Sequence, residues 1–578
     1  MLLSCWRFCR RLCIARYRIY QEAGFCGKIR AMEELKNTLK NTIKQLFDVE
    51  IEPEVTTAPE TLAADFSSNI AMKLSGILHA NPREIAAKIA AEMPGFKTEV
   101  AGPGFLNFIL PDEYYTAKIA DFAKDLPKNI SCDEYSGKTV ICEFSDPNPF
   151  KVLHVGHLYT SIVGDAISRL FEFAGAKVIR ANFGGDVGLH VGKTMWALLN
   201  SGMKDFTIED IAAKYVEGTN AYEEDEKAKS EIVEINKKVY AIAENNLHDS
   251  ELAEIYWRGR ELSYQYFEDF YHKIGVKFDK YYPESTVALR GLKEVENGLA
   301  KGVYEVSDGA VVYRGDTKLN LHTRVFINNE GLPTYEAKDV GLIYTKWDDY
   351  HFDKSVVITA NDIIDYMKIV LGSVGEMNPE LPARTTHITH GNVKLPGNVK
   401  MSSRKGNFLK AVDILNLVSD ELRETYHSTD FTVALGAAKY AFLKYKMGGD
   451  IIFDPEESVK MNGCSGSYLQ YSCVRAKKIL EKCAGISFEN MNLGEPEKAL
   501  SKKIIQYSTV LAEAVHEMAP HKLANYLYEL AQEFSRFYEK CPVAGSEFEK
   551  SRAGLVKVYL DVMTHGLNIL GIEVPEEM

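Results

Sequence analysis

The pattern that most constrains the fold runs from residue 139 to residue 183. TVICEF is predicted to be a buried strand and KVIRANF a second one. The segment between them has a helical apolar face from Leu158 to Leu170, and Gly175 stands where a helix C-terminal cap is expected. Strands joined by a helix normally lie parallel in one sheet with a right-handed crossover. We therefore expect a Rossmann-like, doubly wound α/β domain with a parallel sheet.

Length and pattern together predict an α/β protein of several domains. At 578 residues, 46% of them hydrophobic, the chain is several times longer than one typical domain needs. We expect a small α+β N-terminal domain, then the Rossmann-like domain, in which the β pattern resumes with GAVVYRG, RVFI and SVVITA, and then an all-α C-terminal bundle. PKNISCDEYSGK is predicted to be a linker. The expected ranges are 32–125, 135–435 with a charged helical insertion at about 205–300, and 436–578.

Residues 1–31 differ from the rest of the chain in charge. They carry seven basic residues against one acidic residue. An arginine-rich, acid-poor stretch is typical of an organelle presequence, although the apolar core of a secretory signal is missing. We favour a different interpretation, a non-native upstream extension with Met32 as the working start. The fold is argued without this segment.

The composition does not fit disordered or membrane classes. Charged residues make up 26% of the chain and aromatic residues 11%, and no apolar run approaches the roughly 18 residues of a membrane span. The cysteines beyond residue 31 form no CxxC pair, so neither a structural zinc site nor a disulfide framework is indicated. We expect a soluble protein of a reducing, cytoplasmic compartment.

The net charge of −13 argues, taken alone, against a polyanionic partner. The acidity is uneven, however. Residues 436–578 hold 17 basic and 19 acidic side chains, whereas most of the negative charge lies between residues 32 and 435. The C-terminal domain is therefore the part that would repel an anion least.

KVLHVGH, residues 151–157, lies between the first predicted strand and its helix. His154 and His157 share one face near the helix N-terminus, where free backbone N–H groups and the helix dipole favour a phosphate. Gly156 has no Cβ and lets a flat ring approach the backbone. This arrangement suits ATP. The alternatives are a metal-binding pair, for which further nearby ligands are missing, and ordinary surface histidines.

KMSSRKG, residues 400–406, combines three cations, two hydroxyl groups and a glycine. Such a loop can clamp the charge that develops on a triphosphate during displacement at its α-phosphorus. By itself it would more often be a solvated basic turn. Together with KVLHVGH, this loop is a strong indication of an ATP site.

These two motifs resemble the HIGH and KMSKS signatures of class I aminoacyl-tRNA synthetases, and their surroundings resemble arginyl-tRNA synthetases. The resemblance covers essentially everything from Met32 onward. The segments that carry it, besides the two motifs, are residues 143–148, 185–188, 332–339, 466–471, 520–528 and 571–578.

The resemblance implies a pocket for L-arginine. A guanidinium fork needs carboxylates and planar acceptors. Glu143 and Asp339, with Tyr335 as a wall, match the family's pocket positions, and Ser145 and Asn148 match those that hold the amino-acid end. Asn361, beside Asp362, is a further candidate, although TANDIIDYMK departs from the family's usual polar pattern. The alternative for Asp339 is a solvated helix residue.

The resemblance also implies how ATP is held. The ATP-binding candidates are His154, Gly156, His157, Lys400, Ser402 and Ser403, and the catalytic candidates are Lys151, His154, His157, Lys400 and Lys405. Ser403 replaces the second lysine of the KMSKS pattern, and Lys151 is expected to substitute for it. Mg²⁺ is expected to arrive with ATP, and no tightly bound metal is expected.

The remaining expected partner is the tRNA for arginine. Phe105 and Asn107 fall where the family contacts the tRNA elbow, although Phe105 could equally be a core strand residue. Tyr468, Tyr471 and Arg475 are anticodon candidates that could instead be packing residues. We expect a cytoplasmic monomer without membrane contact. The rival hypotheses are another class I synthetase and a catalytically silent tRNA-binding paralogue.

Overall fold

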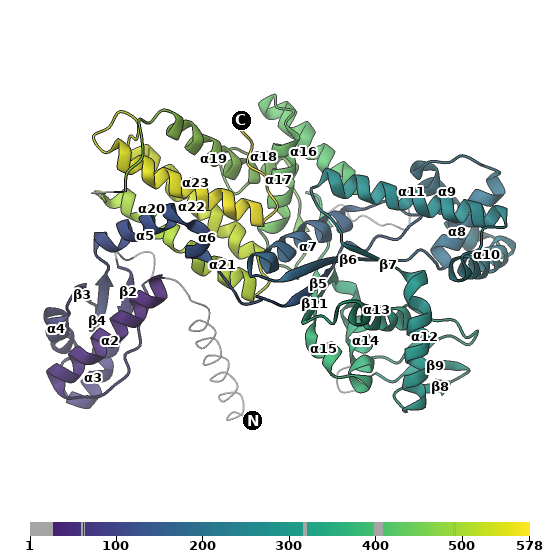
Figure 1. Ribbon diagram of the computed structural model, residues 1–578, viewed down its shortest axis with the longest axis horizontal. Helices are drawn as coiled ribbons and strands as arrows, with labels where there is room; N and C mark the ends of the chain where they lie inside the picture. Colours follow the sequence, from purple (N-terminus) through teal and green to yellow (C-terminus); the bar gives the residue numbers. More distant parts are fainter. Residues whose placement is uncertain are drawn as a thin grey trace.

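The computed structural model describes residues 27–58, 62, 64–315, 321–397, 409–488, 491 and 493–578. Its elements form three groups (Figure 1): a small mixed unit at the N-terminus, a parallel sheet with its helices, and a helical bundle that ends the chain. This is the architecture that the sequence predicts.

The N-terminal unit is an antiparallel sheet packed against helices. Its four strands lie in the order β1-β2-β4-β3. One face of α2 buries Leu35, Leu39 and Ile43, spaced at helical intervals, with Phe66 and Phe108 of the sheet. The elements are α2 (Gly27–Phe47), β1 (Thr56–Thr57), β2 (Phe66–Ser68), α3 (Ile70–Leu78), α4 (Pro82–Glu92), β3 (Lys97–Ala101) and β4 (Phe105–Ile109).

Two helices, α5 (Asp112–Lys124) and α6 (Leu126–Ile130), lead to the sheet. The predicted linker is wrong over its first residues, because the Asp125 side chain accepts the N–H of Lys128 and caps α6. Lys498 of the bundle reaches Asp112 on α5 at 2.6 Å. The connection is therefore packed rather than loose.

The central sheet is parallel, with strand order β12-β11-β5-β6-β7. The predicted strand–helix–strand unit is present as β5 (Thr139–Glu143), α7 (Val155–Phe173) and β6 (Lys177–Gly184), and Gly175 adopts a positive φ just after α7. The other strands are β7 (Lys280–Pro283), β11 (Lys354–Ala360) and β12 (Thr385–His390). The strands run outward from β5 in both directions, so a topological switch point lies between β5 and β11.

Three strands lie where the sequence did not place their pairing. The range 205–300 is mostly helical, but it also holds β7, which pairs with β6. GAVVYRG and RVFI contain strands, as predicted, but they do not extend the parallel sheet. They form β9 (Ala310–Tyr313) and β10 (Arg324–Ile327), which join β8 (Glu305–Ser307) in a separate antiparallel sheet. Alternating side chains specify a strand but not the strand that it pairs with.

Helices surround the parallel sheet, and a group of them stands apart at one end (Figure 1). That group, α8 to α10, shares a core with α11 that includes Val191, Met195, Val239 and Tyr256. The helices are α8 (Leu189–Ser201), α9 (Ile208–Glu224), α10 (Glu226–Asn245), α11 (Glu251–Lys273), α12 (Glu284–Ala300), α13 (Tyr335–Tyr350), η2 (Asn361–Ile363), α14 (Ile364–Met377), α15 (Glu380–Arg384) and α16 (Ala411–Tyr426).

Helices α12 and α13 pack at very close range because glycines line their contact. A Cβ on Gly341 would overlap the carbonyl oxygen of Val287, and one on Gly291 would overlap the carbonyl oxygen of Ala337. We expect Gly341→Ala to push the helices apart and to cost about 1–3 kcal/mol of stability, measured as a lower thermal unfolding midpoint.

The matched control for this prediction is Gly372→Ala on α14. A Cβ at Gly372 would lie 3.5 Å from the hydroxyl of Tyr313, an ordinary contact. Alanine there should be neutral or stabilise by up to about 1 kcal/mol, because it favours the helix over glycine. Equal losses in the two variants would mean that the close helix crossing is not the cause.

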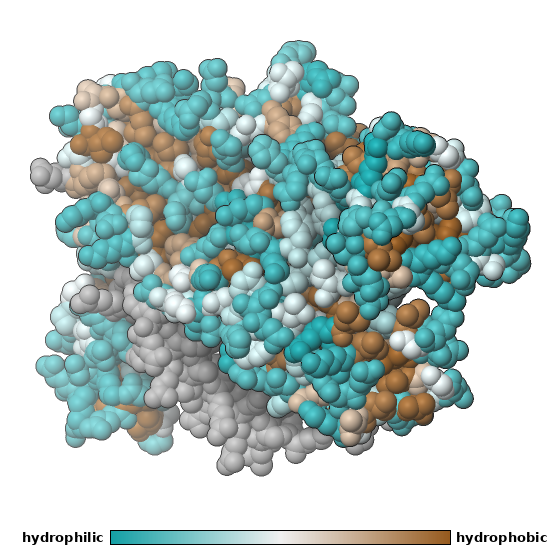
Figure 2. Space-filling view, turned by 45° about the vertical axis from the view of Figure 1, so that its right-hand side comes forward, coloured by the Kyte–Doolittle hydropathy of each residue, from teal (hydrophilic) through white to brown (hydrophobic). Residues whose placement is uncertain are grey.

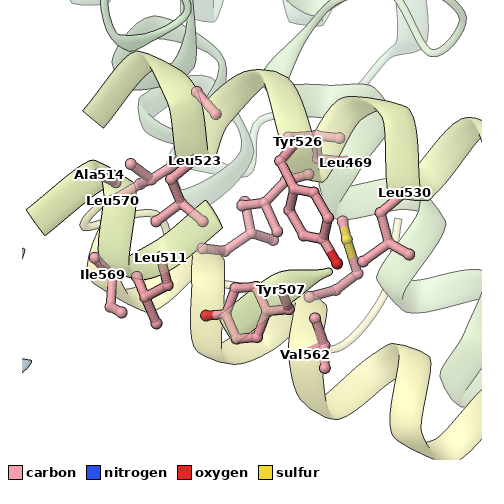
Figure 3. Packing of buried hydrophobic residues seen from close by; sticks show 14 of the residues in the cluster. Leu469, Tyr507, Leu511, Ala514, Leu523, Tyr526, Leu530, Val562, Ile569 and Leu570 are labelled. Carbon is pink, nitrogen blue, oxygen red and sulfur yellow. The ribbon is translucent and has the colours of Figure 1, made fainter. Parts of the chain in front are cut away.

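The C-terminal bundle buries a continuous apolar core. Figure 3 shows Leu469, Leu511, Leu523 and Leu530, which come from three helices, packed in one cluster with Tyr507 and Tyr526. A short parallel pair, β13 (Val393–Lys394) with β14 (Ile451–Ile452), joins it to the sheet region. Its helices are α17 (Phe431–Leu443), α18 (Pro455–Val459), α19 (Gly466–Glu481), α20 (Glu495–Ile505), α21 (Tyr507–His516), α22 (Pro520–Lys540) and α23 (Glu549–Ile569).

The surface is mixed rather than divided into polar and apolar faces. In Figure 2 hydrophilic side chains form most of the visible outline, and apolar patches lie between them. Exposed apolar side chains of this scattered kind are normal in folded proteins. None of the helices in the described part of the chain has the length and apolar character needed to cross a bilayer.

Candidate active site

The candidate site lies at the switch point, where the carboxyl ends of β5 and β11 meet. Ligands of open α/β sheets bind in the crevice outside these strand ends. Glu143 is the last residue of β5, and the loop after it leads to the N-terminus of α7. Asn361 begins η2 directly after β11, and its side-chain amide donates to the carbonyl of Gly448 at 2.7 Å.

The histidine pair forms the N-terminal cap of α7. His154 Nδ1 accepts the N–H of Gly156 at 3.1 Å, and His157 Nδ1 accepts the N–H of His154 at 3.1 Å. The two rings stack with centroids 3.7 Å apart. A Cβ on Gly156 would lie 2.9 Å from Cε1 of His154, so the ring that this glycine admits here is that of His154.

Both histidines are held neutral. Burial and the nearby Lys151 lower the pKa of His154 to about 4, and burial lowers the pKa of His157 well below its usual value. Because each Nδ1 accepts a backbone N–H, we assign the proton of each ring to Nε2. The pair therefore offers uncharged N–H donors at a helix N-terminus. Lys151 lies beside it, with Nζ 4.9 Å from the ring centre of Tyr215.

The loop after β5 has an unusual backbone that hydrogen bonds fix in place. Ser145 and Asp146 have φ values of 73° and 48°, a region that non-glycine residues rarely adopt. The Ser145 hydroxyl lies 2.8 Å from that of Tyr271. Asn148 accepts the N–H of Gly185 at 2.8 Å through its side-chain oxygen. The loop is therefore held against α11 and the end of β6.

The predicted carboxylates of the arginine pocket have different partners. Oε2 of Glu143 lies 2.6 Å from Nζ of Lys346, which is buried on α13. Asp339 is one turn from the start of α13 and accepts the hydroxyl of Tyr366. Burial, together with nearby Glu143, raises the pKa of Asp339 to about 7. Asp339 is therefore a half-buried, hydrogen-bonded residue of α13 rather than a freely solvated one.

Lys338 was not found from the sequence. Its Nζ lies 2.6 Å from Glu284 and 2.8 Å from the hydroxyl of Tyr240, and all but 2% of its surface is buried. The same ammonium lies 5.0 Å from the ring centre of Tyr335, which is 55% exposed. Glu284 and Lys338 are far apart in the sequence, and no local pattern pairs them.

The segment at 185–188 has a structural role that the sequence did not suggest. Asp186 is fully buried, with Arg260 Nε at 2.9 Å and the Ser285 hydroxyl at 2.7 Å. This carboxylate therefore joins the end of β6 to α11 and α12. Lys400, Ser402, Ser403 and Lys405, predicted to bind ATP or act in catalysis, lie outside the described residues.

The candidates for tRNA contact differ in exposure. Phe105 is 39% exposed, so its interpretation as a core residue is wrong, whereas Asn107 on the same strand is buried. The Tyr468 hydroxyl lies 3.0 Å from that of Ser535, which fits the packing alternative. Arg475 lies 4.8 Å from the ring centre of Tyr471 and donates to its hydroxyl.

Family models match along most of the chain. A model described as tRNA synthetases class I (R), catalytic domain, matches residues 126–454. The arginyl tRNA synthetase N terminal domain model matches residues 33–110, and the DALR anticodon binding domain model matches residues 469–578.

Individual proteins match over nearly the whole chain. The arginine–tRNA ligase of Fusobacterium nucleatum is 29% identical over 94% of this chain and 99% of its own. That of Pseudoalteromonas atlantica is 30% identical, with 91% and 96% covered. The arginyl-tRNA synthetase structure of Thermus thermophilus shares the fold, with a TM-score of 0.72 at 21% identity and coverage of 94% and 100%. Since the catalytic-domain model spans more than half of the residues, the chain belongs to the arginyl-tRNA synthetase family of class I enzymes.

Proposed function

We propose that this protein is an arginine–tRNA ligase. It activates L-arginine with ATP to arginyl-adenylate and pyrophosphate, and then transfers arginine to the terminal ribose of its tRNA. The observation that carries the proposal is the neutral histidine pair at the N-terminus of α7, at the end of the loop that begins after Glu143 on β5, with Asp339 near Glu143. Relatives of the same activity, 29–30% identical over more than nine tenths of the chain, support it.

In the activation step, an oxygen of the arginine carboxylate attacks the α-phosphorus of ATP, and the bond from that phosphorus to pyrophosphate breaks. The Nε2–H groups of His154 and His157 donate hydrogen bonds to the phosphates. Free backbone N–H groups at the N-terminus of α7, the positive end of the helix dipole, bind the same phosphates. We assign Lys151, Lys400 and Lys405 to the pyrophosphate charge, with Gly156, Ser402 and Ser403 beside the nucleotide. Mg²⁺ enters as part of the ATP complex.

The transfer step needs no enzyme nucleophile. A ribose hydroxyl at the tRNA 3′ end attacks the carbonyl of the mixed anhydride, the ester bond forms, and AMP leaves with the bonding electrons. Catalysis is then mainly positioning and charge stabilisation. We place the tRNA on Phe105 of the N-terminal unit and on Tyr471 and Arg475 of the bundle; Asn107, which is buried, and Tyr468, which contacts Ser535, rest on the resemblance alone. Exposed Phe105 and the Tyr471–Arg475 pair support this placement.

The arginine pocket uses the ends of β5 and α13. Lys346 occupies one oxygen of Glu143, and we assign the other oxygen, with Asp339, to the guanidinium fork. Tyr335 forms a wall, and Ser145, Asn148 and Asn361 lie toward the amino-acid end. We further propose that the enzyme acts as a cytoplasmic monomer. The free thiols among the described cysteines support a reducing compartment.

The raised pKa of Asp339 predicts a pH-dependent affinity for arginine. The guanidinium binds the ionised carboxylate, and this acid has a pKa of about 7 because it is buried near Glu143 and Glu284. As the pH falls below 7, the protonated fraction grows, and the dissociation constant should rise by up to about tenfold per pH unit. Calorimetric titration with arginine between pH 6 and pH 8 measures this (about one unit either side of the pKa). The Asp339→Asn variant should bind arginine weakly, and its dissociation constant should show no inflection near pH 7. An unchanged inflection in the variant would mean that another group titrates there.

Pyrophosphate exchange with each amino acid, with and without tRNA, tests the function as a whole. We expect exchange with arginine, strongest when tRNA for arginine is present. Exchange with another amino acid but not with arginine would favour a different class I synthetase. Binding of tRNA without exchange would favour a catalytically silent paralogue.

A further inference from the structure

Lys151 differs from the other lysines around the candidate site because it has no carboxylate partner. Lys338 and Lys346 each pair with a buried glutamate at 2.6 Å. In the part of the chain that the structure describes, the Lys151 ammonium has no aspartate or glutamate oxygen within 4 Å. It lies instead over the ring face of Tyr215, with Nζ 4.9 Å from the ring centre. A cation at a proposed phosphate site is therefore held without being neutralised.

An aromatic ring suits this position better than a carboxylate would. A carboxylate beside the ammonium would cancel its charge and compete with a phosphate for it, whereas the negative face of a ring attracts a cation and leaves its full charge. Burial first and the Lys151 charge second lower the pKa of His154 to about 4, and the same two causes lower the pKa of His190 well below its usual value. The positive field of Lys151 therefore extends to the N-terminus of α7, to which we assign the phosphates.

Tyr215 comes from α9, in the helical group that stands apart from the parallel sheet (Figure 1). It shares one face of that helix with Gly218, one turn further on. A Cβ on Gly218 would lie 2.1 Å from the carbonyl oxygen of Lys193, so the backbones of α8 and α9 are in contact there. Helix α8 is in turn tied to the end of β6, because His190 Nε2 lies 2.8 Å from the carbonyl oxygen of Gly185. Close packing therefore fixes where the Tyr215 ring lies.

We propose that Tyr215 is a positioning residue for arginine activation, whose ring face holds the Lys151 ammonium where it meets the pyrophosphate of ATP. The inference rests on the proposed function and on the assignment of Lys151 within it. Tyr215 acts through Lys151 and not on the substrate itself. The helical group α8 to α10 thereby takes part in the chemistry, because one of its helices supplies the platform for a catalytic lysine.

The test measures pyrophosphate exchange with arginine and its tRNA in Tyr215→Leu, which removes the ring, and in Tyr215→Phe, which keeps it. We expect Tyr215→Leu to lower kcat by about 3- to 30-fold, the range of a cation–π contact, with the KM for arginine within about twofold of the wild type. Tyr215→Phe should stay within about twofold in both constants, because the ring face holds the cation without the hydroxyl. A loss in Tyr215→Phe as large as in Tyr215→Leu would contradict the proposal.

A Lys151→Met background separates positioning from a merely structural role. If Tyr215 acts through Lys151, Tyr215→Leu should slow exchange no further once the ammonium is gone. Equal losses in the two backgrounds would mean that the ring serves the fold alone, and the proposal would be overturned. A Lys151→Met variant as fast as the wild type would overturn it as well.

Tyr222→Leu is the matched control on α9. The ring centre of Tyr222 lies 4.6 Å from Nζ of Lys193, a lysine to which no part in the reaction is assigned. This variant should keep kcat within about twofold of the wild type. A loss equal to that of Tyr215→Leu would assign the effect to the packing of α9 and reject the proposal. Absence of arginine exchange in the wild type would instead count against the proposed function.

Discussion

Replacing His157 with alanine is expected to slow arginine activation by about 10²–10³-fold and to leave tRNA affinity unchanged. The imidazole is neutral, its Nδ1 is occupied by the His154 N–H, and only Nε2–H remains to donate to a phosphate. That donor matters most when charge develops on the transferring phosphoryl group. Pyrophosphate exchange measures the first quantity and filter binding of tRNA the second; comparable losses in both would contradict the assigned role.

Two further variants separate donation from helix capping. In His157→Asn, the side-chain oxygen would lie near the position of Nδ1 and keep the bond to the His154 N–H, but the distal donor would be lost. His157→Gln reverses this, because its longer side chain can present N–H near the position of Nε2. If His157 acts by donation, His157→Asn should be as slow as alanine and His157→Gln faster than both. The opposite order would show that the capping bond is what the reaction needs.

The parts of the fold that the sequence predicted depend on local patterns. The unit from β5 to β6 was predictable because a short apolar run, a 3.6-residue period and Gly175 each act within a few residues. Strand β7 was missed because KYYP has four residues and no clear alternation. The sheet joined by β9 and β10 could not be predicted either, since strand pairing is decided by packing between distant segments.

The candidate site also has features that local patterns predicted and features that they did not. The histidine pair was predictable because its spacing within one helical turn is itself the signal. The partners of the carboxylates were not. Lys346 lies 203 residues from Glu143, Arg260 lies 74 residues from Asp186, and Lys338 lies 54 residues from Glu284. Sequence reasoning therefore named candidates for substrate contact from local motifs, and it missed the ion pairs of Glu143, Asp186 and Glu284.

The buried ion pair of Lys338 and Glu284 predicts a second large effect, a loss of stability. Lys338→Met should destabilise the catalytic domain by about 3–5 kcal/mol, because it leaves the buried Glu284 carboxylate without its cation. Burial already raises the pKa of Glu284, and only Lys338 and more distant cations oppose that shift. Thermal unfolding measures the loss, and the KM for arginine should rise with it, since Lys338 lies between Tyr335 and Asp339 on α13.

A double variant shows whether the ion pair itself is responsible. Replacing both Glu284 and Lys338 with methionine removes the unpaired charge and keeps the volume, so it should recover most of the stability lost by Lys338→Met alone. Lys368→Met on α14 is the matched control, because its partner Asp365 is exposed and such pairs contribute about 0–1 kcal/mol. Glu284→Met alone completes the comparison. If the stability losses of Lys338→Met and Glu284→Met simply add in the double variant, Lys338 stabilises α13 through packing rather than through its charge.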